Sequence, residues 1–402
     1  MSRLTQPESC VQRWHSWWHY LAAVPLVIAL GACGLFGGDK DEDPPAELVK
    51  FKSTLKIKKL WSSSVGDGSE NLRLALAPAT NGVHIFAAAH DGRVAAFDPE
   101  KGNRIWKNKT DVPLSAGPVA GPYHVIVGSN DGDVIALDAK NGVELWRVQV
   151  SSEVLAQPAL SGKLVFIRTV DGKLTALDID NGNQVWGVQQ SVPRLSVRGT
   201  AAPVVTNSMV ISGFDNGRLA AYDLSDGGQV WNLLLDPPQG RTEIERLADL
   251  NATVKAVGND LYAVGYQGRL ASVAVESGQL LWSREMSSYA GLTADFNNLY
   301  ISGQHSQLVA VSRRSGREIW QKDVLHNRDI TGPTAFGSSV VVGDFEGYLH
   351  WFDPATGELQ TRVRAGSDRI TTAPLVVSDT LYVVTDGGKL IAFRGVVPKR
   401  ES

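Results

Sequence analysis

Cysteine is nearly absent from this sequence. Among 402 residues only Cys10 and Cys33 occur, which excludes a disulfide framework and allows one disulfide at most. A basic excess is lacking too, because 39 lysines and arginines stand against 42 aspartates and glutamates. No nucleic-acid partner is therefore predicted. Apolar residues at helical spacing are scarce, which disfavours an α-helical fold.

Sequence signatures of catalytic and metal sites are also missing. The histidines beyond residue 34 are dispersed, without the spacing of metal ligands. Residues 171–174 and 386–389 look faintly like phosphate-binding loops, but they lack the preceding glycine frame and the following serine or threonine. No Gly-x-Ser-x-Gly motif occurs. We therefore expect no catalytic residue, no metal and no cofactor, and a protein that is not an enzyme.

The apolar run near the N-terminus is short. Residues 21–30 are apolar, whereas a membrane-spanning helix takes about 20 residues. A run of this length suits the core of a secretory signal. It ends in Leu30-Gly31-Ala32-Cys33, which resembles the lipobox of bacterial lipoproteins. An ordinary signal peptide that contains a cysteine, and an uncleaved membrane anchor, are the alternatives.

The lipobox assigns the first fifty residues. Residues 1–32 are predicted to be a lipoprotein signal peptide, and Cys33 is predicted to carry the lipid. Residues 33–50 form the lipidated cysteine and a flexible tether, because they are rich in charge, glycine and proline. The resemblance to bacterial lipoproteins implies an outer-membrane location facing the periplasm, because Gly34 replaces the aspartate of inner-membrane retention.

A motif of the form Ala-x-Asp-x-x-x-Gly-x-x-x-Trp organises the rest of the chain. Four copies end at Trp106, Trp146, Trp186 and Trp231, and weaker copies end at Trp282 and Trp320. A turn glycine or serine stands fourteen residues before each of these tryptophans. Repeats of about 40 residues indicate a solenoid or propeller. The six tryptophans, together with Trp61, are predicted to stack between neighbouring units, and Trp351 lies outside this pattern.

Each repeat contains strand patterns rather than helical ones. Residues 125–127 and 134–137 flank an Asn-Asp-Gly hairpin turn, and four short strands in about 40 residues make one propeller blade. The eighth copy stops after three strands, and residues 55–61 supply a spare strand. We predict an all-β, eight-bladed β-propeller over residues 51–396, with four-stranded antiparallel blades, a ring closed by the N-terminal strand, and a tail at 397–402.

The connections between repeats vary in length, whereas the repeats do not. Counted from each tryptophan position to the next repeat, three gaps are long, at 17, 17 and 23 residues. Two of them are consecutive, at 187–202 and 232–253, and all connections are predicted to share one face with the hairpin turns. Arginines and acids interleaved with apolar residues suit a protein contact. The alternative is that these loops only cover the end of the core.

The motif resembles the blade signature of quinoprotein alcohol dehydrogenases. That resemblance implies an eight-bladed propeller and, as an alternative function, a periplasmic quinoprotein dehydrogenase or cofactor-binding propeller that holds pyrroloquinoline quinone. The vicinal cysteine pair that often lies over the quinone in those enzymes is missing. A lipid-anchored, sugar-binding propeller is a third class.

The chain as a whole resembles the BamB family, lipoproteins of the outer-membrane β-barrel assembly machinery. The resemblance rests on the lipobox, the tether, the blades, Thr-Glu-Ile-Glu-Arg-Leu-Ala-Asp at 242–249 and Gly-Asp-Phe-Glu-Gly-Tyr-Leu-His-Trp at 343–351. It implies a non-enzymatic scaffold that binds the periplasmic POTRA repeats of BamA and meets other lipoproteins of the complex. It further implies help in the folding or insertion of nascent barrels.

The same resemblance implies the partner-binding residues, which fall in the two consecutive long connections. They are Leu195, Val197, Arg198, Asp249 and Asn251. The family commonly has leucine where Val197 stands, which keeps an apolar contact. It commonly has aspartate where Asn251 stands, so a charge is missing there.

Overall fold

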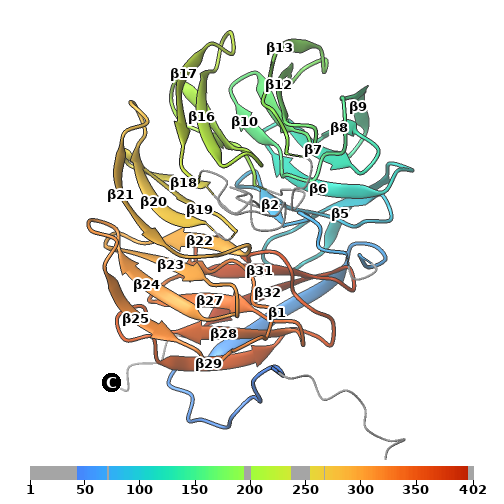
Figure 1. Cartoon of the computed structure of the whole chain (residues 1–402). Coiled ribbons are helices and arrows are strands. Elements are labelled where there is room, and N and C mark those ends of the chain that lie inside the picture. The colour runs from blue at the N-terminus through green and yellow to red at the C-terminus, as the bar shows by residue number, and fades with distance from the viewer. Residues whose placement is uncertain (1–42, 70–71, 194–200, 237–253, 267, 397–402) are drawn as a thin grey trace, which may run out of the picture. The chain divides into compact units, whose positions relative to one another are not determined.

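The computed structural model describes residues 43–69, 72–193, 201–236, 254–266 and 268–396. This part of the chain contains 32 strands and no helix, arranged as eight four-stranded antiparallel sheets (Figure 1). The predicted eight-bladed β-propeller is confirmed. A helix able to cross a membrane is not found among these residues.

The blades follow one another along the chain, with the first strand of each nearest the centre and the fourth outermost (Figure 1). Blades one to four comprise β2 Ala79–Thr80, β3 Ile85–Ala88, β4 Arg93–Phe97 and β5 Arg104–Lys109; β6 Leu114–Ala120, β7 His124–Ser129, β8 Asp133–Asp138 and β9 Glu144–Gln149; β10 Ala159–Ser161, β11 Leu164–Arg168, β12 Lys173–Asp178 and β13 Gln184–Gln189; β14 Val204–Val205, β15 Met209–Gly213, β16 Arg218–Asp223 and β17 Gln229–Leu234. Blades five to eight comprise β18 Val254–Val257, β19 Asp260–Val264, β20 Arg269–Ala274 and β21 Leu280–Glu285; β22 Gly291–Ala294, β23 Asn298–Ser302, β24 Leu308–Ser312 and β25 Glu318–Lys322; β26 Thr334–Phe336, β27 Ser339–Gly343, β28 Tyr348–Phe352 and β29 Leu359–Arg364; β30 Leu375–Val377, β31 Thr380–Thr385 and β32 Lys389–Gly395 with β1 Ile57–Ser64.

The hydrophobic core is divided among the junctions between blades. The second and third strands of each blade are buried on both faces, because a neighbouring blade covers each side. Eight clusters of buried side chains result, and each spans one junction. One of them joins Tyr382 and Leu390 of blade eight to Phe97 of blade one. The packing is therefore continuous around the ring.

The N-terminal strand closes the ring, as predicted. Strand β1 pairs antiparallel with β32, from Ile57 opposite Gly395 to Ser64 opposite Lys389. Figure 1 shows β1 in blue beside the red strands of blade eight. Blade eight therefore takes its third and fourth strands from opposite ends of the propeller sequence, and no blade is left with three strands.

Each repeat tryptophan docks on a turn of the next blade. In blade one, the Trp106 indole N–H donates to the carbonyl of Ala139 at 3.0 Å. A Cβ added to Gly142 would lie 2.4 Å from Cε3 of this ring, and the φ of Gly142 is +76°, so contact and backbone both require glycine. The motif aspartate supports the turn, since Asp138 Oδ1 accepts the amide of Lys140 at 2.8 Å.

The same contact recurs at seven junctions. The donor is the indole N–H, the acceptor is a backbone carbonyl of the next blade, and the distances are 2.8–3.0 Å. The pairs are Trp61–Pro99, Trp106–Ala139, Trp146–Ile179, Trp186–Leu224, Trp231–Val275, Trp282–Arg313 and Trp320–Pro354. The seven tryptophans thus lie between neighbouring blades.

The junction between blades seven and eight lacks this contact. The turn that would receive the tryptophan does not exist in blade eight, because β32 and β1 are not consecutive. Thr361 takes the tryptophan position, and its cross-strand partner is Trp351, whereas blade two pairs Ala136 with Trp146 at the same place. Trp351 therefore fills the alanine position of the repeat, fully buried, rather than standing outside the pattern.

Candidate partner-binding face

One face of the ring carries the hairpin turns between the second and third strands and the connections between blades. We name it the turn face. After the last strand of a blade, a backbone amide donates to the carbonyl of that blade's turn glycine at 2.8–3.3 Å. The pairs are Thr110–Gly92, Val150–Gly132, Gln190–Gly172, Leu235–Gly217, Met286–Gly268 and Ala365–Gly347. These connections start beside the turns, as their spacing predicts.

The two long connections flank blade four on this face. Residues 194–200 and 237–253 within them lie outside the described residues. The predicted partner-binding residues all fall there, and the predicted lipidation site also lies outside the described part: Leu195, Val197, Arg198, Asp249, Asn251 and Cys33. Their side-chain positions stay predictions. Only the described ends of both connections can be placed on the ring.

The first connection is attached to blade four. Gln190 Nε2 donates to the hydroxyl of Tyr222 at 2.8 Å, and Asn216 Nδ2 donates to Ser191 Oγ at 3.3 Å. Tyr222 lies in β16 and Asn216 in the turn before it. The chain leaving blade three is therefore bound to blade four before residue 194.

The second connection is attached to blade five. Asp236 is buried, and its Oδ2 accepts the backbone amide of Arg269, the first residue of β20, at 3.1 Å. Burial raises the pKa of Asp236, while the hydrogen bond and the charge of Arg269 oppose the rise. Both connections therefore reach the turn face of the blade ahead, one on each side of blade four.

A buried ion pair joins blades three and four on the same face. Arg168, at the end of β11, donates from Nη2 to Asp215 Oδ1 at 3.1 Å, and its guanidinium lies 4.8 Å from the ring centre of Phe214. The two charged side chains are only 6% and 1% exposed. Removing either one would leave the other charge buried, which proteins tolerate poorly.

The connection between β1 and β2 crosses the ring. Ala75 donates its backbone amide to Ser115 of blade two at 3.0 Å. Arg73 forms an ion pair with Asp329, which lies between blades six and seven, and its guanidinium is 5.1 Å from the ring centre of Tyr289. These partners belong to distant blades, so the segment passes over the middle of the ring. The unusual length of the connection between Trp61 and Pro78 is the feature of the sequence that could have indicated the position of Arg73.

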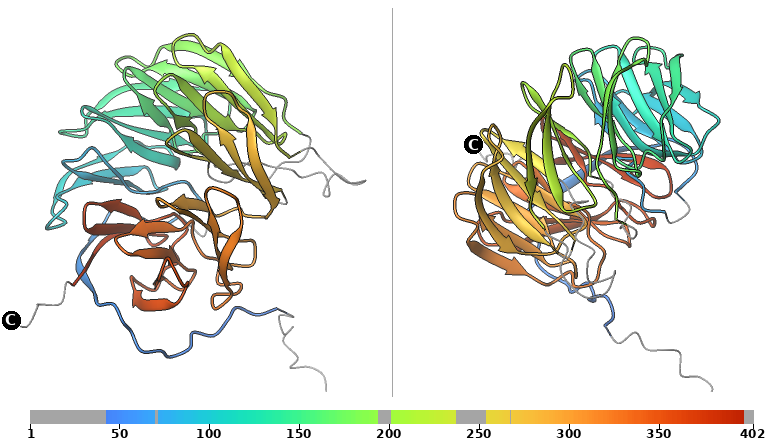
Figure 2. Two further views of the ribbon diagram at one scale, coloured as in Figure 1. Left: turned by 90° about the vertical axis from the view of Figure 1, so that its left-hand side faces the viewer. Right: turned by 45° about the horizontal axis from the view of Figure 1, so that its top comes forward.

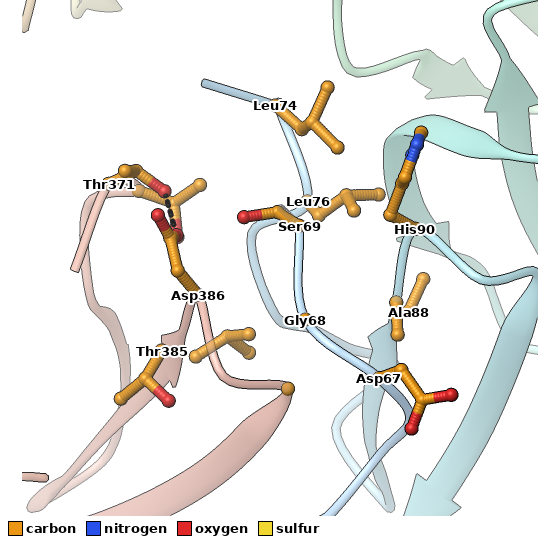
Figure 3. A pocket seen from close by; sticks show the side chains of 14 residues that line it. Asp67, Gly68, Ser69, Leu74, Leu76, Ala88, His90, Thr371, Thr385 and Asp386 are labelled. Atoms are coloured by element: carbon orange, nitrogen blue, oxygen red, sulfur yellow. Dashed lines mark hydrogen bonds between the residues drawn. The ribbon is translucent and has the colours of Figure 1, made fainter. Parts of the chain in front are cut away.

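A small cavity lies between blades eight and one (Figure 3). Ser69, His90 and Asp386 are among its lining residues, and Thr371 donates to Asp386 Oδ1 at 2.8 Å. Burial raises the pKa of Asp386, and the Thr371 hydrogen bond and the charge of Arg369 oppose the rise. The cavity measures about 20 Å³. That is room for one water, whereas sites for organic cofactors measure about 300–1,000 Å³.

Possible metal ligands do not gather elsewhere in the described part. No group of three or more histidine, cysteine, aspartate or glutamate side chains there could hold a metal ion. The charged clusters instead pair acids with arginines, as Arg168–Asp215 and Arg369–Asp386 illustrate. Such pairs tie neighbouring blades and connections together.

Asp344, in the turn of blade seven, is the centre of a buried network. Its Oδ2 accepts from Arg328 Nε and from His350 Nε2, both at 2.9 Å, and its Oδ1 accepts the amides of Glu346 and Tyr348. Burial alone would raise the pKa of Asp344. The contact with His350, the Tyr348 amide and the charge of Arg328 outweigh burial, so the pKa lies below its ordinary value.

His350 gives this network a pH dependence. Its ring is fully buried, and burial lowers its pKa although Asp344 opposes the shift. Within the described residues Nδ1 has no hydrogen-bond partner, which fits a neutral ring with the proton on Nε2.

We expect the free energy of unfolding to decrease as the pH falls below about 6.5, the ordinary histidine pKa. There the unfolded chain gains a proton that the folded chain does not bind, at a limiting slope of about 1.4 kcal/mol per pH unit. His350→Gln should flatten this part of the curve in urea unfolding series from pH 7.5 to 5.0. An unchanged slope in the variant would show that His350 is not responsible.

The sequence matches known proteins over most of its length. The family model described as outer membrane protein assembly factor BamB matches residues 90–322 and 304–396. The outer membrane protein assembly factor BamB of Pseudomonas aeruginosa is 44% identical over 376 residues, which cover 94% of this chain and 98% of that protein. The chain belongs to the BamB family. A crystal structure of BamB from Moraxella catarrhalis, 27% identical, has a TM-score of 0.77 and covers 84% of this chain and 100% of that one.

Quinone enzymes share the architecture of the BamB family. The quinohemoprotein alcohol dehydrogenase of Comamonas testosteroni has a TM-score of 0.66 at 15% identity, and the match covers 86% of this chain and 78% of that one. Likeness at this level of identity concerns the fold alone. The repeat motif that resembles both families is thus a property of the blade.

Proposed function

We propose that this chain is a non-enzymatic scaffold of the outer-membrane protein assembly complex. It binds the periplasmic POTRA repeats of BamA, meets other lipoproteins of the complex and assists the folding or insertion of nascent barrels. A lipid on Cys33, after removal of residues 1–32, holds it at the outer membrane facing the periplasm. The observation that carries this proposal is the match to BamB proteins along nearly the whole chain.

The proposed contact surface is formed by the two connections that flank blade four. Arg198 supplies the charged anchor, Leu195 and Val197 supply apolar contacts, and Asp249 and Asn251 supply polar ones. The attachment of both connections to the turn face supports this choice, because Ser191 and Asp236, 45 residues apart in the sequence, are thereby held on the same face, one on each side of blade four. Arginine suits such a role because its planar guanidinium can bind a carboxylate through two hydrogen bonds.

Charge reversal at the anchor tests the surface. Arg198→Glu is expected to abolish co-purification with BamA from solubilised membranes, because a carboxylate would face the acceptor of the guanidinium. The thermal unfolding midpoint should stay within about 2 °C, as for a surface substitution.

Arg317→Glu is the matched control. Arg317 is an exposed arginine in the turn between β24 and β25, away from the turn face. Reversal of its charge should leave co-purification intact. Full recovery of BamA with the Arg198 variant would refute the proposed surface.

A further inference from the structure

The chain just before the propeller follows the outer edge of blade seven. Residues 46–55, which we name the strap, run along β29 (Figures 1 and 2). Thr54 donates its backbone amide to the carbonyl of Gln360 at 2.9 Å, and Thr361 Oγ1 donates to Ser53 Oγ at 3.4 Å. Residues 46–50 of the predicted tether are therefore in contact with the propeller.

Two arginines hold the strap further along. Arg362 Nη2 donates to the carbonyl of Val49 at 3.3 Å, and its guanidinium lies 5.3 Å from the ring centre of Phe51. Arg328 Nη1 donates to the carbonyl of Ala46 at 3.0 Å. Arg328 is itself fixed by Asp344, so the strap ends on a buried charged network. The contacts of these two arginines extend along the strap from Ala46 to Phe51.

Apolar side chains of the strap are packed as well. Leu48 contacts the cluster between blades six and seven, and Leu55 contacts the cluster between blades seven and eight. These contacts anchor the strap at both ends. Burial of leucine against an apolar cluster is favourable, so the strap is stabilised by more than its hydrogen bonds.

The edge of blade seven differs from the other edges at the places where the strap binds. In blades one to six, the residue before the tryptophan position forms a β-bulge and is aliphatic and 45–49% exposed: Ile105, Leu145, Val185, Val230, Leu281 and Ile319. In blade seven the bulge residue is Gln360, followed by Thr361 rather than tryptophan. The two residues that contact Thr54 and Ser53 are thus the ones in which this blade departs from the repeat.

The strap runs between the two faces of the ring. Thr54 lies at the start of β29, next to the turn at 353–357, on the face opposite the turn face. Ala46 donates its amide to the carbonyl of His326 at 2.9 Å, and the next residue, Asn327, donates to His305 in the turn of blade six. Since that turn belongs to the turn face, the chain enters the propeller on the turn face. It crosses to the opposite face along the outer edge of blade seven and then runs back toward the turn face as β1.

We propose that the strap fixes the root of the lipid tether on the turn face, beside the junction of blades six and seven. The proposal rests on the proposed lipid at Cys33. Residues 34–45, twelve in number, then separate the lipid from the root and span at most roughly 40 Å. Without the strap the root would be Ile57 on the opposite face, and the free chain would reach roughly 80 Å.

The consequence concerns orientation at the membrane. The strap places the anchored end of the chain and the two connections that flank blade four on one face of the propeller. The turn face is thereby held toward the membrane surface, within reach of a partner anchored in the same bilayer. The strap thus adds a positioning element to the proposed scaffold.

A disulfide trap tests whether the strap is docked in the full lipoprotein. The hydroxyl oxygens of Ser53 and Thr361 are 3.4 Å apart, so cysteines at these places can bond after small rotations. We expect S53C/T361C to oxidise nearly completely in the periplasm, as measured by mass spectrometry of the linked peptides. The control S53C/I319C, on the edge of blade six, should stay reduced. A reduced S53C/T361C pair would overturn the docking.

Energy transfer to a membrane tests the orientation. Donor dyes are placed on D131C or K140C, two exposed sites just beyond opposite ends of β8, and the purified lipoprotein is inserted into vesicles that contain acceptor lipids. We expect at least twofold more efficient transfer from D131C, on the turn face. In the variant L48S/F51S, which removes two apolar side chains of the strap, the difference in transfer efficiency between the two sites should vanish or reverse.

The outcomes separate the two proposals. The same ranking in the wild-type and L48S/F51S proteins would overturn the orienting role of the strap, and an absence of transfer from both sites would overturn the lipid anchor on which it rests. BamA is absent from the vesicle experiment. Loss of the BamA interaction would therefore contradict the scaffold proposal without affecting the energy-transfer result.

Discussion

Replacing Asp344 by alanine is expected to lower the free energy of unfolding by about 3–5 kcal/mol, the cost of breaking a buried ion pair. Arg328 and His350 would lose a common acceptor, and the amides of Glu346 and Tyr348 would lose theirs. The Arg328 side chain is only 4% exposed, so water cannot replace the carboxylate, and its remaining ion pair is with the more exposed Glu346. The loss should therefore exceed that of an ordinary turn residue.

Urea unfolding monitored by tryptophan fluorescence measures this difference. Asp131→Ala is the matched control, because Asp131 occupies the corresponding hairpin turn of blade two but is exposed. Its effect should stay within about 0.5 kcal/mol. Equal effects of the two substitutions would mean that the network around Asp344 does not stabilise the blade.

The Asp344 carboxylate also determines how the free energy of unfolding changes with pH in the acid range. The folded-state pKa of Asp344 is lowered, so its contribution is complete above the unfolded value of about 3.9 and is lost as the pH falls through the folded value. Wild-type protein should therefore lose stability more steeply below pH 4 than Asp344→Ala. The slope due to His350 appears at higher pH, which allows the two to be separated.

The fold could be predicted because the repeat keeps both docking partners at fixed positions. Trp106 and Gly142 each occupy a constant place in their own copy of the motif, so the contact between them repeats with the motif. The sequence likewise showed that the eighth copy of the repeat lacks its fourth strand and that residues 55–61 form a strand without a blade of its own. Local patterns and their spacing are sufficient when every unit meets its neighbour in the same way.

The exceptions to the repeat are harder to predict than the repeat itself. Trp351 stands four residues after Gly347, as Ala136 stands four after Gly132, but only the pairing of β28 with β29 shows that it lies opposite Thr361 in the place of the alanine. The strap escaped prediction because residues 46–50 continue a charged, proline-containing segment. The few apolar residues of the strap, among them Leu48, Phe51 and Leu55, do not by themselves identify a docking site.

The candidate site also has one part that could be predicted from the sequence and one part that could not. Its two long connections could be found from gap lengths, which are a property of the sequence alone. The ion pairs Arg73–Asp329 and Arg168–Asp215 could not, because each joins side chains from different blades or connections that meet only when the ring has formed. The order of charged residues along the chain does not indicate which of them form such pairs.

Replacing Gly142 by alanine should cost about 3–4 kcal/mol of unfolding free energy, although only one methyl group is added. The φ of +76° disfavours any residue with a Cβ by about 1–2 kcal/mol, and the new methyl would collide with the Trp106 ring. Gly162→Ala separates these two effects. Gly162 also has a positive φ, +55°, but no heavy atom lies within 4 Å of an added Cβ. Its substitution should cost only the backbone share, about 1–2 kcal/mol.

A double-mutant cycle assigns the remainder to the tryptophan. In a Trp106→Leu background the smaller side chain leaves space at the turn, so the added cost of Gly142→Ala should fall toward that of Gly162→Ala. The cycle is measured by urea unfolding of the four proteins. If Gly142→Ala cost the same in both backgrounds, the glycine would be required by its own backbone alone. The constant spacing of glycine and tryptophan in the repeat would then have two independent causes. A coupling free energy of about 1.5–2 kcal/mol would instead show that the contact between the two residues fixes their spacing in the repeat.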